Sequence, residues 1–329
     1  MSGLHYDFCT LFDRNYLFKG LALHESLQRH VQDFTLWVLC MDDVAYEVLA
    51  KMRLPEMELI SLAQFEDDEL LRAKATRTQV EYCWTCTPSL PLYVLDHSPG
   101  IEAVTYLDAD LFFFGDPAGA YAEMDEGSVG IVGHRFAAAH AHQTQDAGIY
   151  NVSFMIFKND EHARECLEWW RARCNEWCYQ RVEDGKFGDQ KYLDDWPARF
   201  ARVVVLQEVG IGVAPWNLGS DRFRRRGGRV LVDGRSLIYY HFHSFLIMGG
   251  GDQFRLADPG YPVGRREARL LYKPYVASVR RAMTEVRRAV PGYAYGVSSE
   301  RLEPRSVRLR ADVHRAVRSV PVLRRLRRL

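Results

Sequence analysis

The sequence lacks the features that mark membrane-spanning, secreted and disulfide-bonded proteins. No run of about 18 apolar residues occurs, so no segment is long enough for a transmembrane helix. Residues 1–13 do not contain a basic segment followed by an apolar one, which argues against a secretory signal and predicts a cytoplasmic protein. The chain also has no internal repeat and no low-complexity linker before about residue 260. What remains is a chain whose 47% hydrophobic content suffices for a large buried core.

Cysteine is present but in a pattern that excludes a disulfide framework. The seven cysteines are an odd number, which is more typical of reduced thiols. Two pairs, Cys83 with Cys86 and Cys174 with Cys178, could be read as zinc ligands. Because tryptophans and long apolar stretches surround these pairs, buried free thiols are the preferred interpretation.

An excess of charge of either sign is absent from the whole chain but not from its parts. Residues 265–329 contain 18 lysines and arginines and five acidic residues, so they carry a formal charge of +13 and the first 264 residues carry −13. We therefore expect an acidic domain over residues 1–262 and a basic, helical C-terminal extension over residues 263–329. A basic segment of this kind favours an anionic surface as its partner.

Hydrophobic periodicity alternates between strand and helix along the chain, which predicts an α/β fold with a parallel-rich sheet. Apolar strands are expected over residues 6–12, 34–40, 58–62, 103–107, 129–132, 152–157, 203–206 and 237–242. Helices are expected over residues 16–29, 44–52, most of 65–95 with interruptions at Pro88 and Pro91, 163–180, 272–290 and 306–329.

Two carboxylates, Asp108 and Asp110, follow directly on the apolar strand expected over residues 103–107. The carboxyl ends of strands are where open α/β sheets bind ligands. Paired carboxylates suit a hard divalent cation, which would neutralise a diphosphate leaving group. The alternative is a loop in which one aspartate only caps a helix.

Two histidines end another apolar strand. His241 and His243 are two residues apart and share one face of that strand, so both or neither would point to a site. Imidazole suits Mn²⁺ as a third ligand beside the carboxylates. We take His241 as the ligand and keep His243 as the alternative.

The order of these motifs resembles that of the glycogenin-like, family 8 glycosyltransferases, which have the GT-A fold. The resemblance covers about residues 5–245. It rests on Cys9–Tyr16 with the helix that follows, Tyr106–Asp110, Tyr150–Ser153, Gly188–Gln190 and His241–Phe242. Ser153 stands where the family usually has glycine, and the family's Lys-Pro-Trp after the histidine is missing. Lys273-Pro274-Tyr275 comes about thirty residues later, so Lys273, Arg255 or no residue takes the place of the lysine that contacts the diphosphate.

The resemblance implies an enzyme that transfers a hexose from a nucleotide-sugar donor with Mn²⁺ or Mg²⁺. Uridine diphosphate as the carrier and retention at the anomeric carbon are the family's defaults. The implied donor-binding residues are Thr10, Leu11, Tyr16, Asp108, Asp110, Asn151 and Ser153, with Tyr16 stacking on the base. The implied metal ligands are Asp108, Asp110 and His241. Asp189 and Gln190 would lie next to the transferred sugar and are the expected catalytic residues.

The sequence also indicates which acceptor and which membrane surface the protein is expected to bind. Segments such as Tyr82–Pro88 look like those of bacterial enzymes of surface-polysaccharide synthesis, which suggests a polysaccharide or a lipid-linked glycan as acceptor. Apolar residues recur on one helical face from Ser306, with arginines around it, so we expect the enzyme to be peripheral at the inner, anionic face of a membrane. No nucleic-acid partner is expected. The acidic domain would repel nucleic acid, and in the basic C-terminal extension no aromatic motif for single-stranded nucleic acid is interleaved with the basic residues. A nucleotidyltransferase or phosphotransferase with the same two-carboxylate site, and a non-enzymatic binding protein with a basic tail, are the alternatives.

Overall fold

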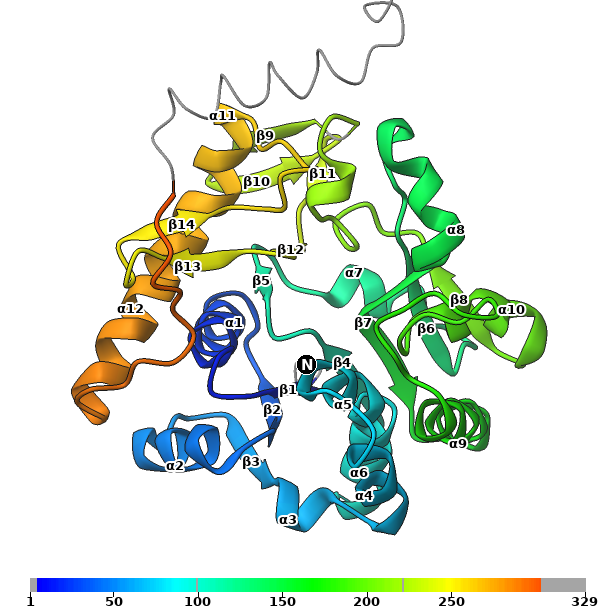
Figure 1. Cartoon of the computed structure of the whole chain (residues 1–329). Helices are drawn as coiled ribbons and strands as arrows, with labels where there is room; N and C mark the ends of the chain where they lie inside the picture. Colours follow the sequence, from blue (N-terminus) through cyan, green and yellow to red (C-terminus); the bar gives the residue numbers. More distant parts are fainter. Residues whose placement is uncertain (1–4, 99, 221, 303–329) are drawn as a thin grey trace, which may run out of the picture. The chain divides into compact units, whose positions relative to one another are not determined.

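Seven of the apolar runs pair into one mixed sheet in the computed structural model (Figure 1), which describes residues 5–98, 100–220 and 222–302. In order across the sheet, the strands are β3 (Met57–Ser61), β2 (Phe34–Cys40), β1 (Tyr6–Phe12), β4 (Ala103–Leu107), β7 (Tyr150–Lys158), β6 (Val129–Gly133) and β8 (Val203–Leu206). Only β7 runs antiparallel to its neighbours, β4 and β6. The parallel-rich mixed sheet expected from the sequence is therefore present.

The alternating side chains of the central strand β1 divide the core between two faces. Cys9 and Leu11 belong to the apolar cluster that also contains Trp170 and the buried residues of α5 (Gln79–Cys86) and α6 (Ser89–His97). Phe12 points to the other face, because the Cβ of an alanine at Gly20 of α1 (Leu17–His30) would lie 2.4 Å from its ring. Helix α1 packs in turn against α12 (Lys273–Ala289).

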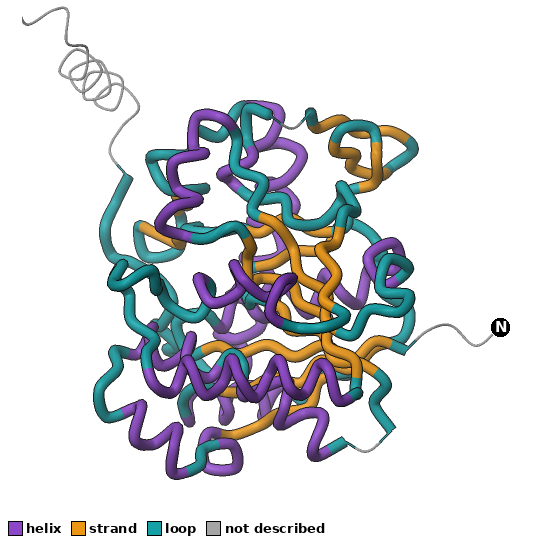
Figure 2. Tube along the Cα trace, turned by 90° about the vertical axis from the view of Figure 1, so that its right-hand side faces the viewer, coloured by secondary structure: helices purple, strands orange, loops and turns teal. Residues whose placement is uncertain are grey.

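The remaining elements connect the strands of this sheet or extend it. The other helices are α2 (Asp43–Met52), α3 (Leu62–Phe65), α4 (Asp68–Lys74), α7 (Ala118–Tyr121), α8 (Thr144–Ala147), α9 (Glu161–Glu176), α10 (Trp196–Arg199) and α11 (Arg265–Glu267), with short 3₁₀ turns at residues 138–143, 191–195 and 215–217 and a π turn at 268–272. Two smaller sheets are β5 (Leu111–Phe113) with β12 (Tyr239–His241), and β9 (Phe223–Arg226) with β10 (Arg229–Val232) and β11 (Arg235–Ser236). The small three-stranded sheet is visible as a separate hairpin at the upper right of Figure 2.

Residues 246–255 and 297–302 belong to a second, small compact unit, which is described here by itself. It contains the hairpin of β13 (Leu246–Met248) and β14 (Gln253–Arg255), and its turn is made by Gly249, Gly250 and Gly251, all at positive φ. The backbone amide of Ser298 donates to the carbonyl of Ile247 over 2.9 Å.

Two expectations differ in detail from the structure. Pro91 does not interrupt a helix, because it lies in the first turn of α6, where its missing N–H has no partner to lose. Helix α9 ends at Glu176, four residues before the expected end. The compact unit that contains the sheet continues from residue 256 to Gly296, so the boundary at residue 262 stays a prediction. The helix expected over residues 306–329 lies outside the described residues. Among the residues that are described, no helix has both the length and the hydropathy needed to cross a membrane.

Candidate functional site

One edge of the large sheet collects the polar residues that follow its central strands. The carboxyl ends of β1, β4 and β6 meet at this edge. Because β7 is antiparallel, its amino end, with Asn151 and Ser153, lies beside the carboxyl end of β4. Asp108 follows β4 directly, and its backbone amide donates to the carbonyl of Ser153 over 3.0 Å. This arrangement brings residues from distant parts of the sequence to one place.

Asp108, Asp110 and His241 form a compact cluster at this edge. Their potential ligand atoms all lie within 4.8 Å of one another, and they are the only such cluster of histidine, cysteine, aspartate and glutamate side chains among the described residues. The His241 Nε2 lies 3.0 Å from Asp110 Oδ1 and 3.7 Å from Asp108 Oδ2. Asp110 and His241 are buried, whereas the side chain of Asp108 is 30% exposed. The cluster thus has a closed side and an open side.

The pairing of β12 with β5 brings His241 to the two carboxylates. His241 is in register with Leu111, the residue after Asp110, and the backbone amide of Phe242 donates to the carbonyl of Asp110 over 2.9 Å. His243 is exposed and lies outside the cluster, although its ring centroid is 5.7 Å from that of His241. The structure therefore separates two histidines that the sequence treats as alternatives.

The electrostatics of the cluster show that its charges depend on one another. Burial raises the pKa of Asp108 to about 6, despite the attraction of His241. Burial alone would also raise the pKa of Asp110, but the neighbouring His241 and Lys19 lower it well below its ordinary value. Burial would lower the pKa of His241, and the carboxylates of Asp110 and Asp108 raise it instead. The cluster is therefore a preformed set of anionic oxygens held in place by cationic groups.

A second network at the same edge joins residues from three elements. The side-chain amide of Asn151 donates to Gln190 Oε1 over 3.0 Å and lies 3.2 Å from His134 Nε2. Burial lowers the pKa of His134 to about 3, so the ring is neutral at pH 7 and can accept this hydrogen bond. Gln190 Nε2 donates in turn to the carbonyl of Ala147 over 2.7 Å. Ser153 is buried, and its amide donates to Asn151 Oδ1 over 3.0 Å.

Asp189 precedes Gln190 in the chain and is also buried. The indole N–H of Trp170 donates to its carbonyl oxygen over 2.8 Å, which ties this loop to α9. Burial, followed by the charge of Asp108, raises the pKa of Asp189 to about 7. Asp189 therefore lies within electrostatic range of the three-residue cluster.

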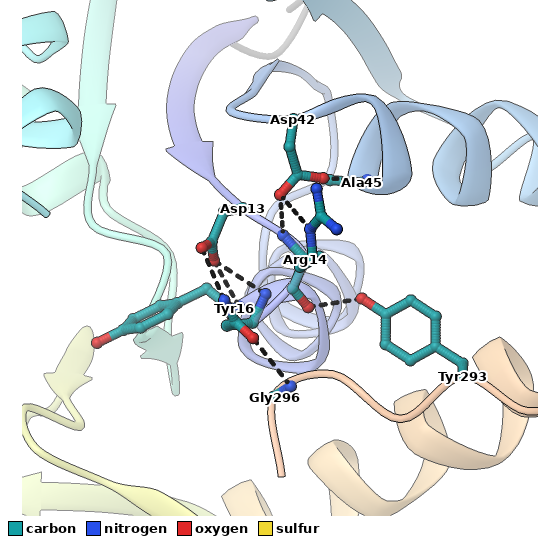
Figure 3. A network of polar contacts seen from close by, with 8 residues as sticks. Asp13, Arg14, Tyr16, Asp42, Ala45, Tyr293 and Gly296 are labelled. Carbon is teal, nitrogen blue, oxygen red and sulfur yellow. Dashed lines mark hydrogen bonds and ion pairs between the residues drawn. The ribbon is translucent and has the colours of Figure 1, made fainter. Parts of the chain in front are cut away.

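The remaining predicted residues lie in β1 and in the loop that leads from it to α1. Thr10 and Leu11 lie within β1 and are buried, and Thr10 Oγ1 has no hydrogen-bond partner. Figure 3 shows how the loop is fixed. Asp13 accepts from the backbone amide of Tyr16 over 3.2 Å, and Arg14 Nε donates to Asp42 over 3.0 Å. The Tyr16 side chain, 41% exposed, projects away from this network in Figure 3.

The sequence analysis missed Lys19, which lies beside the cluster. Its Nζ is 3.9 Å from Asp110 Oδ2 and 3.7 Å from the centroid of the Tyr16 ring. The signal in the sequence was a single lysine within the otherwise apolar segment LFKGLAL. In the structure every residue of this segment is buried. Lys273 is exposed at the start of α12, and Arg255 belongs to the small second unit.

Comparison with known proteins assigns the chain to a family. It is 33% identical over 303 residues to the uncharacterized protein YfnD of Bacillus subtilis (strain 168), covering 90% of this chain and 95% of YfnD. The chain belongs to the family of YfnD. The uncharacterized protein YfnF of the same organism is 38% identical over 248 residues, covering 73% of this chain and 82% of YfnF. No family model matches the sequence.

The structure of the galactosyltransferase LgtC, in complex with donor and acceptor sugar analogs, superposes with a TM-score of 0.50. The match covers 84% of this chain and 95% of LgtC, at 12% sequence identity. This likeness concerns the fold, and it confirms the GT-A fold expected for the catalytic domain of this YfnD relative. The assignment to family 8 and the roles of the individual site residues stay predictions.

Proposed function

We propose that this protein is a glycosyltransferase that uses a divalent cation and a nucleotide-sugar donor. The observation that carries the proposal is the Asp108, Asp110 and His241 cluster at the ligand-binding edge of a GT-A sheet. Two carboxylates and an imidazole suit Mn²⁺ or Mg²⁺. The buried Nζ of Lys19 has no hydrogen-bond partner, as expected of a site that a ligand completes. When bound, the cation would supply Lewis-acid stabilisation of the leaving diphosphate.

The side chains around the cluster have proposed roles in binding and reaction. Tyr16 would stack on the nucleotide base, with Thr10 and Leu11 beside it. Asn151 and Ser153 would bind the donor sugar. Asp189 and Gln190 would lie next to its anomeric carbon.

Two stereochemical outcomes make different use of Asp189 and Gln190. With retention, Gln190 would stabilise the positive charge that develops on the sugar ring. With inversion, Asp189 would act as the general base. The anomeric configuration of the product, read by NMR, decides between them: a β-linked product from an α-linked donor would exclude retention.

The acceptor that we propose is a polysaccharide or a lipid-linked glycan, with the enzyme at the inner face of the membrane. The support comes from the basic sequence of residues 301–329 and from the bacterial enzymes that the sequence resembles. Transfer to a glycan, rather than to a phosphate or a nucleotide, separates this proposal from a nucleotidyltransferase or phosphotransferase.

The proposal is tested by Mn²⁺ binding and donor turnover in a matched pair of variants. His241→Asn should weaken Mn²⁺ binding by more than about 100-fold, beyond the loss typical of residues that only support a ligand. His243→Asn, two residues away and outside the cluster, should retain Mn²⁺ binding. Asp110→Ala should abolish release of sugar from the donor, and a chelator should do the same to the unmodified enzyme. Turnover that survives both would exclude the metal-dependent reaction.

A further inference from the structure

Lys19 is a charged residue in a helix segment that is otherwise apolar and fully buried. Leu17, Phe18, Leu21, Ala22 and Leu23 are all at most 6% exposed, and Lys19 itself is only 4% exposed. Lysine is almost never fully buried without a partner, because its ammonium loses hydration. The packing of α1 alone does not explain why a lysine occupies this buried position.

The surroundings of Lys19 leave its hydrogen-bonding capacity unused. The ammonium has three donors and no acceptor, and its nitrogen has no hydrogen-bond partner. Asp110 Oδ2 is 3.9 Å away, too far for a hydrogen bond. The other oxygen of that carboxylate, Oδ1, is engaged by His241 at 3.0 Å. Asp110 thus attracts Lys19 without satisfying it.

A second polar group of the same region is also unsatisfied. The hydroxyl of Tyr275, on α12, is buried and has no hydrogen-bond partner. Its ring stacks on that of Phe242, with the ring centroids 3.7 Å apart, and the backbone amide of Phe242 donates to the carbonyl of Asp110 over 2.9 Å. Two buried donors from different helices, α1 and α12, thus lie near one carboxylate. Anionic acceptor oxygens would satisfy both.

The chemistry of the proposed donor identifies these oxygens. Asp108 and Asp110 would already offset the charge of a bound divalent cation, so the negative charge of the diphosphate needs a further cationic group. Lys19 is three residues after Tyr16 and therefore on the same side of α1, and its Nζ lies 3.7 Å from the centroid of the Tyr16 ring. Because this ammonium covers one face of the ring, a nucleotide base would stack on the other face, with its phosphates directed toward the cluster and Lys19.

We infer that Lys19 binds the diphosphate of the nucleotide-sugar donor, in place of the lysine that the resemblance leads one to expect after His241. The inference rests on the proposed function. It also explains how this chain can lack the family's Lys-Pro-Trp, because the positive charge comes from the first helix instead.

The test compares Lys19→Met with the unmodified protein by isothermal titration calorimetry in the presence of Mn²⁺. UDP, GDP, ADP and CDP are titrated first, and the diphosphate that binds is then compared with its nucleoside. Lys19→Met should bind that diphosphate about 10- to 100-fold more weakly, as expected when a hydrogen bond to a charged group is lost. Nucleoside affinity should stay unchanged. Lys19→Gln, which keeps donors but no charge, is the second variant and should show a smaller loss.

Mn²⁺ binding without nucleotide separates ligand binding from a structural role. Lys19→Met removes a cation beside Asp110, so Mn²⁺ alone should bind at least as tightly as to the unmodified protein. A structural role would instead weaken Mn²⁺, nucleoside and diphosphate together, and that result would overturn the inference. Unchanged diphosphate affinity would overturn it as well, as would a loss confined to Lys273→Met. If the unmodified protein binds no nucleoside diphosphate, the proposed function itself fails.

Discussion

His24 is buried on α1, and its Nε2 lies 2.8 Å from the carbonyl oxygen of Pro55. Burial lowers the pKa of His24 below its ordinary value in spite of this contact. As the pH falls, His24 is therefore protonated near pH 6.5 in the unfolded chain but only at a lower pH in the folded protein. The free energy of unfolding is therefore unaffected by His24 above pH 6.5 and decreases as the pH falls from 6.5 toward the pKa of His24 in the folded protein.

We therefore predict that His24→Gln reduces the loss of stability between pH 7 and pH 5. One proton corresponds to at most about 1.4 kcal/mol per pH unit. Urea denaturation at several pH values measures the free energy of unfolding of both proteins. His97→Gln is the matched control, because His97 is exposed. If the two substitutions change the pH dependence equally, burial of His24 is not the cause.

The three residues of the Asp108, Asp110 and His241 cluster could be selected from the sequence, but their surroundings could not. Asp108 and Asp110 stand out because they follow a strand whose end the apolar pattern defines. The choice between His241 and His243 depends on the pairing of β12 with β5, and a pairing between segments more than 120 residues apart leaves no local trace. Lys19 was not predicted as a site residue, because helical periodicity identifies the apolar residues of a buried face and gives no role to a single polar residue among them.

At the scale of elements, the contact between α1 and β1 is tight. A methyl group at Gly20 would lie 2.4 Å from Cε1 of the buried Phe12. We predict that Gly20→Ala destabilises the fold by about 1–2 kcal/mol, because overpacking outweighs the better helix propensity of alanine. Urea denaturation measures the effect. Adding Phe12→Leu should recover part of the loss, and additive losses in the double variant would contradict a clash between these residues.

The small sheet of β9, β10 and β11 carries a like-charged pair. Arg226 lies directly opposite Arg229, both are exposed, and neither forms an ion pair with another described residue. We predict that Arg226→Glu stabilises this sheet by about 0.2–1 kcal/mol, because it replaces repulsion with attraction. Slower amide hydrogen exchange in β10 is the measurement. Arg225→Glu, opposite Val230, is the control and should gain less, and added salt should reduce the difference.

Local patterns were enough for most elements of the large sheet but not for their connections. The bounds expected for β1, β2, β4 and β8 agree with the structure because each is a short apolar run. The helix interruption predicted at Pro91 is absent, because proline breaks helices in their interior but is tolerated in their first turn. The antiparallel direction of β7 depends on its pairing with β4 and β6, which the pattern of a single strand does not contain.

At the scale of the whole molecule, the uneven charge predicts binding to an anionic membrane surface. Residues 303–329, outside the described structure, contain all the arginines of the predicted amphipathic helix. Each basic residue near an anionic leaflet contributes about 1 kcal/mol, so several together would hold the enzyme there. A truncation after Leu302 removes this segment and keeps the hydrogen bond from the Leu302 amide to Gln253.

We predict that the full chain floats with anionic vesicles at low salt and that the version ending at Leu302 does not. High salt should release the full chain, because it screens the attraction between arginines and lipid phosphates. Neutral vesicles are the control for binding through the apolar face alone. The competing arrangement is a helix that packs on the acidic body, which would be resistant to protease and indifferent to lipid. If the full chain ignores anionic vesicles at low salt, the membrane role fails and that arrangement takes its place.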